Sequence, residues 1–539
     1  MKTILKQIIV FTCFPVLTFA YTGEVVKSFN TPGAHPTGLT FDGKYLWLAD
    51  RKTDKLYCID TASGKVIREI PSPAYWPTGL AWDGTNLWNA DVKGGIPLAE
   101  NYNGKIYKMD PKSGKILNTV QAPSSTPRGL VWDGKYLWCT DSHSAEIIQF
   151  DPKDGTTIKS FKAPAKDPRG LAFDGKYLWI SDRRRDEIYM MDTEYGNVIL
   201  IANAPGPFCE ALCYDGKFLW AADYQNKKLY KLKVNDGEKF KRDNARKAKI
   251  TYTHLATNFG PGKVNTLDVY FAMPIDRDNQ EIKGEIKYSP KYSDVVTDKW
   301  GQKFAHYSVK DINAGGSNEI QMTSVVTTYD VRYFIYPDKV EGLEKIPAGI
   351  KSKYLENNEK FQYDNPVIQS ALSEALGDEK NPYWIARKIF NYVIATMQYE
   401  MTGGWNTAPT VLKRGTGSCS EYSFVYIAMC RAAGLPARYV GSVVERGDKA
   451  SMDDVFHRWV EVYLPGYGWI PVDPSGGDDE LPRDQADSFG ALVNRFYITT
   501  ESGGGSEFLE WTYNSHEFYT TDPKTNVVIE YFADWDVAE

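Results

Sequence analysis

Short runs of alternating hydrophobic and polar residues fill the chain from residue 21 to about 235, and they repeat. The segment PTGLTFDGKYLWLAD returns with substitutions in five copies, which occupy residues 36–50, 77–91, 127–141, 168–182 and 209–223. Each copy continues with further strand-like runs, such as KLYCID (55–60) and KVIREI (65–70). Four short strands in about 41 residues predict one blade of a β-propeller per repeat.

The two ends of this region complement each other. The fifth copy stops after its third strand, KLYKLKV (227–233), whereas GEVVKSFN (23–30) has the pattern of a fourth strand and precedes the first copy. An N-terminal strand that completes the last blade would close the ring and remove its edges. We therefore predict an all-β, five-bladed propeller over residues 21–240, built of repeats that resemble the NHL and YVTN types. A sixth blade would require one repeat to have lost its signature.

Residues that recur in every copy have a different meaning from residues that do not. Asp-Gly stands between the first two strands of each copy, where we expect a type I′ turn with positive φ at both residues. The symmetry of a ring explains the repeated Asp and Trp, so we assign them structural roles. The insertion Gly94–Tyr102 and the basic run Arg183–Arg185 depart from the repeat. Both follow second strands, whose loops share one face, which would hold either a protein or glycan ligand or only solvent.

Longer strand-like runs follow the repeats, and helical patterns follow those. The runs 249–257, 265–274, 281–289 and 325–337 are separated by Asn, Gly and Pro, which predicts a β-sandwich over residues 245–345. Helices are then expected after Asn365 and Asn381, each an N-cap residue followed by proline. The pattern thus changes from all-β to mixed α and β near residue 346.

Cys419 is the first candidate for chemistry. An apolar helix is predicted from Cys419 to about Ala433, where Gly434 and Pro436 end it. Cys419 then lies in the first helical turn, where unpaired N–H groups and the positive end of the helix dipole favour a thiolate. The alternative is a buried structural cysteine, which is our interpretation of Cys430.

A histidine and an aspartate downstream are spaced so that they can serve that cysteine. A strand beginning at His457 ends at Pro465, and the chain returns toward Asp473. In a hairpin centred on Pro465, paired residue numbers sum to 930, so His457 and Asp473 stand directly opposite on one face. A slip of one residue would put them on opposite faces. We predict that Cys419 is the nucleophile, His457 its base and Asp473 the group that orients the histidine.

These segments resemble the transglutaminase-like superfamily. The family pattern G-x-C-x-[DE]-[YF] is met at 417–422, R-x-x-G-[IL]-P-[AT]-R-x-V at 431–440, and H-x-W-x-E-V-Y-x-P-x-x-G-W-x-x-x-D-P at 457–474. The resemblance implies an α+β, papain-like catalytic domain, which we place at residues 346–539 together with the strand-like C-terminal runs. It also implies a Cys419-His457-Asp473 triad that acts on an amide or ester carbonyl.

The same resemblance implies an oxyanion hole. The backbone N–H of Cys419 would be one donor. A second donor often comes from a side chain ahead of the cysteine, and Trp405 and Tyr399 are the candidates. Arg458 departs from the family, which commonly has alanine there. This leaves the triad intact but is expected to alter access beside His457.

Three functions stay open at this point. Water attacking the thioester would give hydrolysis of protein or peptide amides, which we favour for an exported chain with a propeller. A lysine amine attacking it would give a cross-linking transglutaminase. The third alternative is a non-catalytic, propeller-based binding or scaffold protein with an inert core.

Composition and the N-terminus restrict these functions further. The chain of 539 residues has a net charge of −6 and a pI near 5.7, which argues against nucleic acid as a partner. A basic start, an apolar stretch and Thr18-Phe19-Ala20 predict a signal peptide at residues 1–20 and a secreted or periplasmic protein with no transmembrane segment. Four of the cysteines fall in predicted strands as small buried residues, and no metal or cofactor motif is present.

Overall fold

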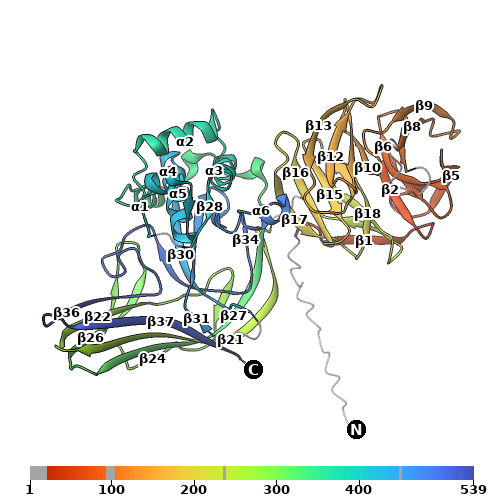
Figure 1. Cartoon of the computed structure of the whole chain (residues 1–539). Coiled ribbons are helices and arrows are strands. Elements are labelled where there is room, and N and C mark those ends of the chain that lie inside the picture. Colours follow the sequence, from red (N-terminus) through yellow and green to blue (C-terminus); the bar gives the residue numbers. More distant parts are fainter. Residues whose placement is uncertain (1–20, 93–103, 235–237, 402–403, 448–451, 539) are drawn as a thin grey trace, which may run out of the picture.

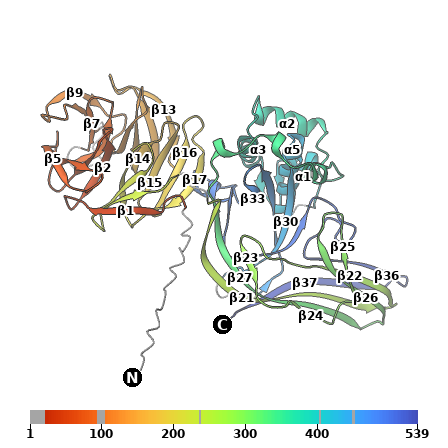
Figure 2. The ribbon, with the colours of Figure 1, turned by 180° about the vertical axis from the view of Figure 1, so that it is seen from behind.

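The computed structural model describes residues 21–92, 104–234, 238–401, 404–447 and 452–538 (Figure 1). The expected signal peptide and the whole insertion Gly94–Tyr102 lie outside these ranges. Figures 1 and 2 show an N-terminal ring of sheets on one side, a helical region beside it, and long curved strands beneath the helical region. None of the helices among the described residues combines the length and the apolar character needed to cross a membrane.

The N-terminal region consists of five antiparallel sheets of four strands each. The sheets contain, in turn, β2 (Pro36–Phe41), β3 (Tyr45–Asp50), β4 (Lys55–Asp60) and β5 (Val66–Pro71); β6 (Pro77–Trp82), β7 (Leu87–Asp91), β8 (Lys105–Met109) and β9 (Ile116–Gln121); β10 (Pro127–Trp132), β11 (Leu137–Asp141), β12 (Glu146–Phe150) and β13 (Thr157–Lys162); β14 (Pro168–Phe173), β15 (Tyr177–Asp182), β16 (Glu187–Asp192) and β17 (Val198–Asn203); and β18 (Cys209–Tyr214), β19 (Leu219–Asp223), β20 (Lys228–Leu232) and β1 (Val25–Asn30).

The first strands of the five sheets contact one another in sequence order, and β18 contacts β2, so the arrangement is a closed, propeller-like ring. The N-terminal strand β1 pairs with β20, with Phe29 opposite Leu229. The first and last parts of the repeat region therefore share one sheet, which leaves no gap in the ring.

Each sheet is held by the same tryptophan–aspartate pair. The indole N–H donates to an aspartate in the preceding turn, at 2.8–2.9 Å in all five copies: Trp47 to Asp42, Trp88 to Asp83, Trp138 to Asp133, Trp179 to Asp174 and Trp220 to Asp215. The indoles are almost fully buried, so this donor needs a partner inside the fold. The repeated residues thus have the structural role that ring symmetry suggests.

The turn itself differs from the expected type I′. In the first copy, Gly43 has φ of +94°, whereas Asp42 is not in the left-handed region. Asp42 instead uses its carboxylate to accept the backbone N–H groups of Lys44 (2.9 Å) and Tyr45 (2.7 Å). The glycine is therefore the first central residue of a two-residue loop, and the aspartate precedes it as a capping residue.

The middle region forms two antiparallel sheets. One contains β21 (Phe240–Gly260), β23 (Gln280–Ile282), β24 (Lys287–Ser289), β27 (Ser317–Tyr333), β31 (Met452–Asp453), β34 (Ala491–Leu492) and β37 (Asn526–Val537), and the other contains β22 (Val264–Ala272), β25 (Asp294–Thr297), β26 (Lys303–Ile312) and β36 (Ser515–Thr521). Apolar side chains of both sheets, such as Ile250 and Val269, form one buried cluster.

The C-terminal strands differ from our expectation. We attached them to the catalytic region, but β37 pairs along β21, with Tyr252 opposite Ala533, and β36 pairs with β22, with Val269 opposite Glu517. The chain thus leaves the middle region, builds the helical region, and returns to complete the same two sheets. The reason is long-range edge pairing, which covers the open edges of β21 and β22.

The helical region contains η1 (Pro337–Lys339), η2 (Leu343–Lys345), α1 (Ala348–Tyr354), α2 (Pro366–Leu376), α3 (Pro382–Thr396), α4 (Ala408–Arg414), α5 (Cys419–Ala432) and α6 (Pro482–Asp487). Its sheet has the order β33 (Gly468–Val472), β32 (His457–Leu464), β30 (Ala437–Val444) and β35 (Phe496–Ser502), and a short pair joins β28 (Gln398–Tyr399) to β29 (Thr416–Gly417). The side-chain oxygens of Asn365 and Asn381 cap α2 and α3 as predicted.

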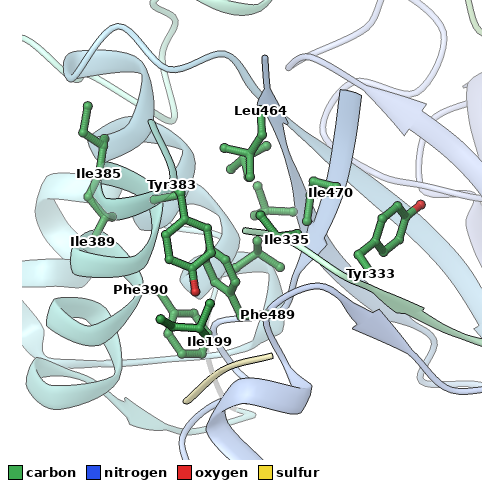
Figure 3. Packing of buried hydrophobic residues seen from close by; sticks show 14 of the residues in the cluster. Ile199, Tyr333, Ile335, Tyr383, Ile385, Ile389, Phe390, Leu464, Ile470 and Phe489 are labelled. Carbon is green, nitrogen blue, oxygen red and sulfur yellow. The ribbon is translucent and has the colours of Figure 1, made fainter. Parts of the chain in front are cut away.

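The apolar contact between the ring and the helical region is made mainly by the outer strand β17. The outer strand β5 has the sequence VIREIP and is mostly exposed, whereas β17 has the apolar sequence VILIAN and is buried from Val198 to Ala202. Ile199 of β17 lies beside Phe390 of α3 and Phe489 in one apolar cluster (Figure 3). Burial of these side chains against α3 and α6 explains why this sheet, and not another, faces the helical region.

An ion pair reinforces that contact. The Arg483 guanidinium of α6 donates to both carboxylate oxygens of Glu187 on β16, at 2.7 and 2.9 Å. Burial alone would raise the pKa of Glu187, but hydrogen bonds and charge from Arg483 lower it. The Arg483 backbone N–H also donates to the carbonyl of Pro164 in the ring (3.1 Å).

Candidate active site

The nucleophile candidate stands at the start of the central helix. Ser418 is the N-cap of α5 and Cys419 its first residue. Glu421, fully buried in the first turn, accepts hydrogen bonds from the backbone N–H of Asn406 (3.0 Å) and from Arg414 (2.7 Å). This carboxylate therefore fixes the loop before α4 against the end of α5 that carries Cys419.

His457 and Asp473 meet as the sequence predicts, although the hairpin register is different. Observed pairs such as Val460 with Val472 sum to 932 rather than 930, because the loop is centred on Gly466 and not on Pro465. A shift of two residues keeps every side chain on its face. His457 Nε2 consequently still reaches Asp473 Oδ2, at 2.6 Å.

Hydrogen bonds from the two residues Ser475 and Gly476 hold the Asp473 carboxylate in place. Its second oxygen, Oδ1, accepts from the Ser475 backbone N–H (3.0 Å), the Ser475 hydroxyl (2.7 Å) and the Gly476 N–H (3.0 Å). One oxygen is thus fixed by the backbone and the other is left for the imidazole. The His457 ring also stacks on Trp459 and Phe496, with centroids 5.8 and 5.6 Å apart, which restricts its rotation.

The pKa values of these groups shift together. Burial alone would lower the pKa of His457, but the charge and hydrogen bond of Asp473 raise it to about 10. Burial would raise the pKa of the Cys419 thiol, yet the hydrogen bond and charge of His457 outweigh it and lower that pKa. Asp473 has a lowered pKa, because the imidazolium charge outweighs its burial. The arrangement therefore favours a thiolate–imidazolium pair.

Another cysteine of the same helix shows the contrast. Cys430 lies in the last turn of α5 and is completely buried. Burial raises the pKa of its thiol, so Cys430 stays protonated. The other four described cysteines are buried in ring strands, which confirms their prediction as small strand residues.

Arg458 occupies an unusual environment next to His457. Its side chain is fully buried, and its guanidinium lies 4.4 to 5.3 Å from the centres of four aromatic rings, those of Tyr439, Tyr513, Trp405 and Phe424. Nη2 donates to the carbonyl of Trp511 (2.5 Å), whereas Nε and Nη1 have no partner among the residues described. The cation thus lacks a carboxylate, and its charge helps to lower the pKa of Cys419.

The two expected oxyanion donors lie differently. Tyr399 is half exposed, and burial followed by the charges of Cys419 and Asp473 raises the pKa of its hydroxyl, so this ring lies beside the triad. The Trp405 ring instead packs on Arg458. Tyr399 is therefore the better placed of the two.

Tyr513 is a neighbour that the sequence did not indicate. Burial and the charge of Cys419 raise the pKa of its hydroxyl, and its ring lies 4.6 Å from the Arg458 guanidinium. A Cβ on Gly441 would come within 2.4 Å of the Tyr513 side chain. The glycine on β30 therefore leaves the room that Tyr513 fills.

A cavity of about 670 Å³ opens between the ring and the helical region. Asp473 and Trp459 line it, together with Glu187 and Arg483 of the ring contact, but Cys419 and His457 do not. This cavity therefore reaches the site only at Asp473.

Known proteins match parts of the chain. An uncharacterized protein of Haemophilus influenzae is 28% identical in an alignment of 145 residues that covers 22% of this chain and 39% of that protein. The protein YebA of Bacillus subtilis is 38% identical in an alignment of 71 residues that covers 11% of this chain and 10% of YebA. The chain thus spans about two-fifths and one-tenth of these relatives. A structure from Cytophaga hutchinsonii, described as a "putative cysteine protease", has 17% identity and a TM-score of 0.39 and covers 54% of this chain and 92% of its own.

A family comparison agrees with the motifs. The model of the transglutaminase-like superfamily matches residues 370–474, which run from α2 through Cys419 and His457 to Asp473. Residues 370–474 of this chain therefore form a domain of the transglutaminase-like superfamily.

Proposed function

We propose that the protein is a cysteine enzyme that cleaves amide bonds of proteins or peptides through Cys419, His457 and Asp473. The observation that carries this proposal is the His457–Asp473 hydrogen bond of 2.6 Å, in a site where His457 lowers the pKa of the Cys419 thiol. A buried structural cysteine would have the raised pKa of Cys430 instead. This contrast supports a catalytic over a structural role.

The proposed reaction has two steps. The Cys419 thiolate attacks the carbonyl carbon of the scissile amide, and the resulting oxyanion accepts hydrogen bonds from the Cys419 backbone N–H at the start of α5. Protonated His457 gives its proton to the leaving amine, and the C–N bond breaks to leave a thioester. His457 then takes a proton from water, which attacks the thioester and releases the acid and the free thiolate. Asp473 keeps the imidazole in place throughout.

Two neighbours support this assignment. The Tyr399 hydroxyl is proposed as the second oxyanion donor, because the charges of Cys419 and Asp473 both act on it. Arg458 is proposed as a positioning residue: its cation, which lacks a carboxylate partner, lowers the pKa of the Cys419 thiol without touching substrate.

The remaining parts of the chain receive proposed roles of the same kind. Residues 21–240 are proposed as a five-bladed propeller that binds a ligand, and residues 245–345 as a β-sandwich to which the C-terminal strands belong. An N-terminal signal peptide at residues 1–20 would export the protein to the periplasm or the medium. The substrate would then be an extracellular or envelope peptide.

Product analysis tests the proposed reaction. Mature protein is incubated with casein and a primary amine, and the products are analysed by mass spectrometry beside those of Cys419→Ala. Shortened peptides that depend on Cys419 are the expected result. Amine adducts on glutamine would show transfer, and hence a cross-linking enzyme, instead of hydrolysis. Identical spectra for the two proteins, together with unreactive Cys419 toward a thiol probe, would favour the non-catalytic binding protein.

A further inference from the structure

A second candidate site lies in the ring, at the face where the first strands begin and the second strands end, far in sequence from Cys419, His457 and Asp473. We call this face the mouth of the ring. A pocket of about 320 Å³ is lined by residues at or near strand ends of all five sheets of the ring, and four of its nine lining residues are arginines. They are Arg51, Arg128, Arg169 and Arg183.

These arginines occupy two positions of the repeat at which the residue type differs from copy to copy. The residue after the start of the first strand is Thr37, Thr78, Arg128, Arg169 and Glu210 in the five copies. The residue after the second strand is Arg51, Val92, Ser142, Arg183 and Tyr224. Their neighbours in each copy, the Trp, the Asp and the Gly-Leu pair, hardly vary. Ring architecture explains the constant residues but not the variable ones.

Arg169 is the most deeply placed of the four. Its side chain is 8% exposed, Nη2 lies 2.9 Å from Asp167 and Nη1 only 3.8 Å from Glu210. Its Nε has no partner among the described residues. A buried guanidinium with an unused donor costs free energy unless a ligand completes it.

Arg128 and Arg51 have no ion pair within the described part of the chain. Arg128 donates from Nε to the Ser142 hydroxyl (3.2 Å), and burial followed by the charge of Arg169 lowers the pKa of its guanidinium to about 10. Arg51 lies over the Trp76 ring, 3.1 Å from its centre. Neither cation therefore has a carboxylate of its own as a counter-ion among the described residues.

The carboxylates nearby do not balance this charge. Asp167 pairs with Arg169 and with Arg183, at 2.8 and 2.9 Å from the latter, and Glu210 lies 3.7 Å from Arg183. These two carboxylates are therefore engaged by Arg169 and Arg183, and neither forms an ion pair with Arg51 or Arg128 among the described residues. Burial and the charge of Arg51 lower the pKa of the His35 imidazole.

We propose that this pocket binds an oxyanion group, a carboxylate, sulfate or phosphate, of a compact ligand. Guanidinium groups match the paired oxygens of such anions, and Arg51 and Arg128 have no carboxylate partner of their own in the described part of the chain. The aromatic faces are already used, since Arg51 covers Trp76 and the His35 ring stacks on Tyr224 with centroids 4.6 Å apart. No free platform is left for a sugar ring, so a compact anion fits better than a neutral glycan.

Calorimetry and thermal unfolding of the full chain test this site. The probes are inorganic phosphate, sulfate, and trialanine with a free or an amidated C-terminus, all at constant ionic strength. At least one anion is expected to bind and to raise Tm, and Arg128→Gln is expected to weaken its binding about tenfold or more. Arg68→Gln, on the exposed outer strand β5, is the matched control and should bind as the wild type does.

The probes distinguish a peptide carboxylate from an inorganic anion, and the variants distinguish a binding role of the arginines from a structural one. Binding of trialanine but not of its amide assigns a peptide carboxylate, and binding of phosphate or sulfate alone assigns a free inorganic anion; both support the site. If an arginine serves to bind a ligand, the fold should not need it when no ligand is bound. The Tm of ligand-free Arg128→Gln and Arg51→Gln should therefore be no lower than that of the ligand-free wild type. Failure of every probe to bind, or affinities that neither variant changes, would overturn the proposal.

Discussion

Replacing Asp473 with asparagine tests the electrostatic design of the catalytic site. The His457 pKa of about 10 lies far above the ordinary 6.5, which corresponds to about 5 kcal/mol of preference for the imidazolium form. Asparagine keeps an oxygen within reach of Nε2 but removes the charge. Burial then dominates, so the pKa of His457 should fall below 6.5 and the pKa of the Cys419 thiol should rise to 9 or above.

The assay is the rate of Cys419 alkylation by iodoacetamide as a function of pH, followed by peptide mass spectrometry. Because the imidazolium persists up to about pH 10 in the wild type and lowers the pKa of the Cys419 thiol, the wild-type rate should change less between pH 6 and 9 than that of an ordinary thiol. In Asp473→Asn the rate should rise by about tenfold per pH unit over that range, since an ordinary thiol is ionised to only about one part in a thousand at pH 6. At pH 6 the variant should react at least about tenfold more slowly.

Two comparisons make this result decisive. Asp479→Asn changes an exposed carboxylate on the same loop and should leave the profile unchanged. Cys430, buried in the same helix, should stay unlabelled in every variant. Superimposable pH profiles for wild type and Asp473→Asn would refute the thiolate–imidazolium pair and, with it, the role of Asp473.

Three further substitutions probe the surroundings. Arg458→Met should lower the Cys419 alkylation rate at pH 7 by about three- to tenfold without lowering Tm, because an uncompensated buried cation is replaced by an apolar side chain of similar length; an unchanged rate would contradict its positioning role. Arg483→Ala should leave Glu187 buried without its partner and cost about 3 kcal/mol, measured by urea unfolding, with earlier trypsin cleavage between ring and helical region; unchanged proteolysis would show that β17 packing alone suffices. Trp179→Phe keeps an aromatic side chain but removes the N–H donor to Asp174, and it should destabilise the N-terminal sheets by about 1–2 kcal/mol in the same urea assay. Trp384→Phe, which lies in α3 outside these sheets, should not destabilise them.

The repeats made the ring region predictable from sequence. A strand pattern that recurs with the same Asp and Trp indicates both the elements and their local pairing, and the missing fourth strand pointed to β1. Pairing between distant segments left no such signal. The period of β36 and β37 marks them as strands but says nothing of their partners, so their return to β21 and β22 needed the structure.

The catalytic candidates were predictable for a different reason. The parity of a hairpin decides which side chains share a face, and a register error of two residues left His457 and Asp473 together. The surroundings of Arg458 were not predictable, because its aromatic neighbours come from separate segments of the chain. In the same way, the arginines at the mouth of the ring are separate positions in the sequence that only the closed ring brings together.

Trapping of the covalent intermediate tests the central claim most directly. The protein is mixed with a peptide p-nitrophenyl ester, quenched in acid within seconds, digested and analysed by mass spectrometry. The account predicts an acyl group on the peptide that contains Cys419, lost on treatment with hydroxylamine and absent from Cys419→Ala and strongly reduced in His457→Gln. Turnover of the ester with no acyl group on Cys419, or an equal yield of acylated Cys419 in His457→Gln, would contradict it.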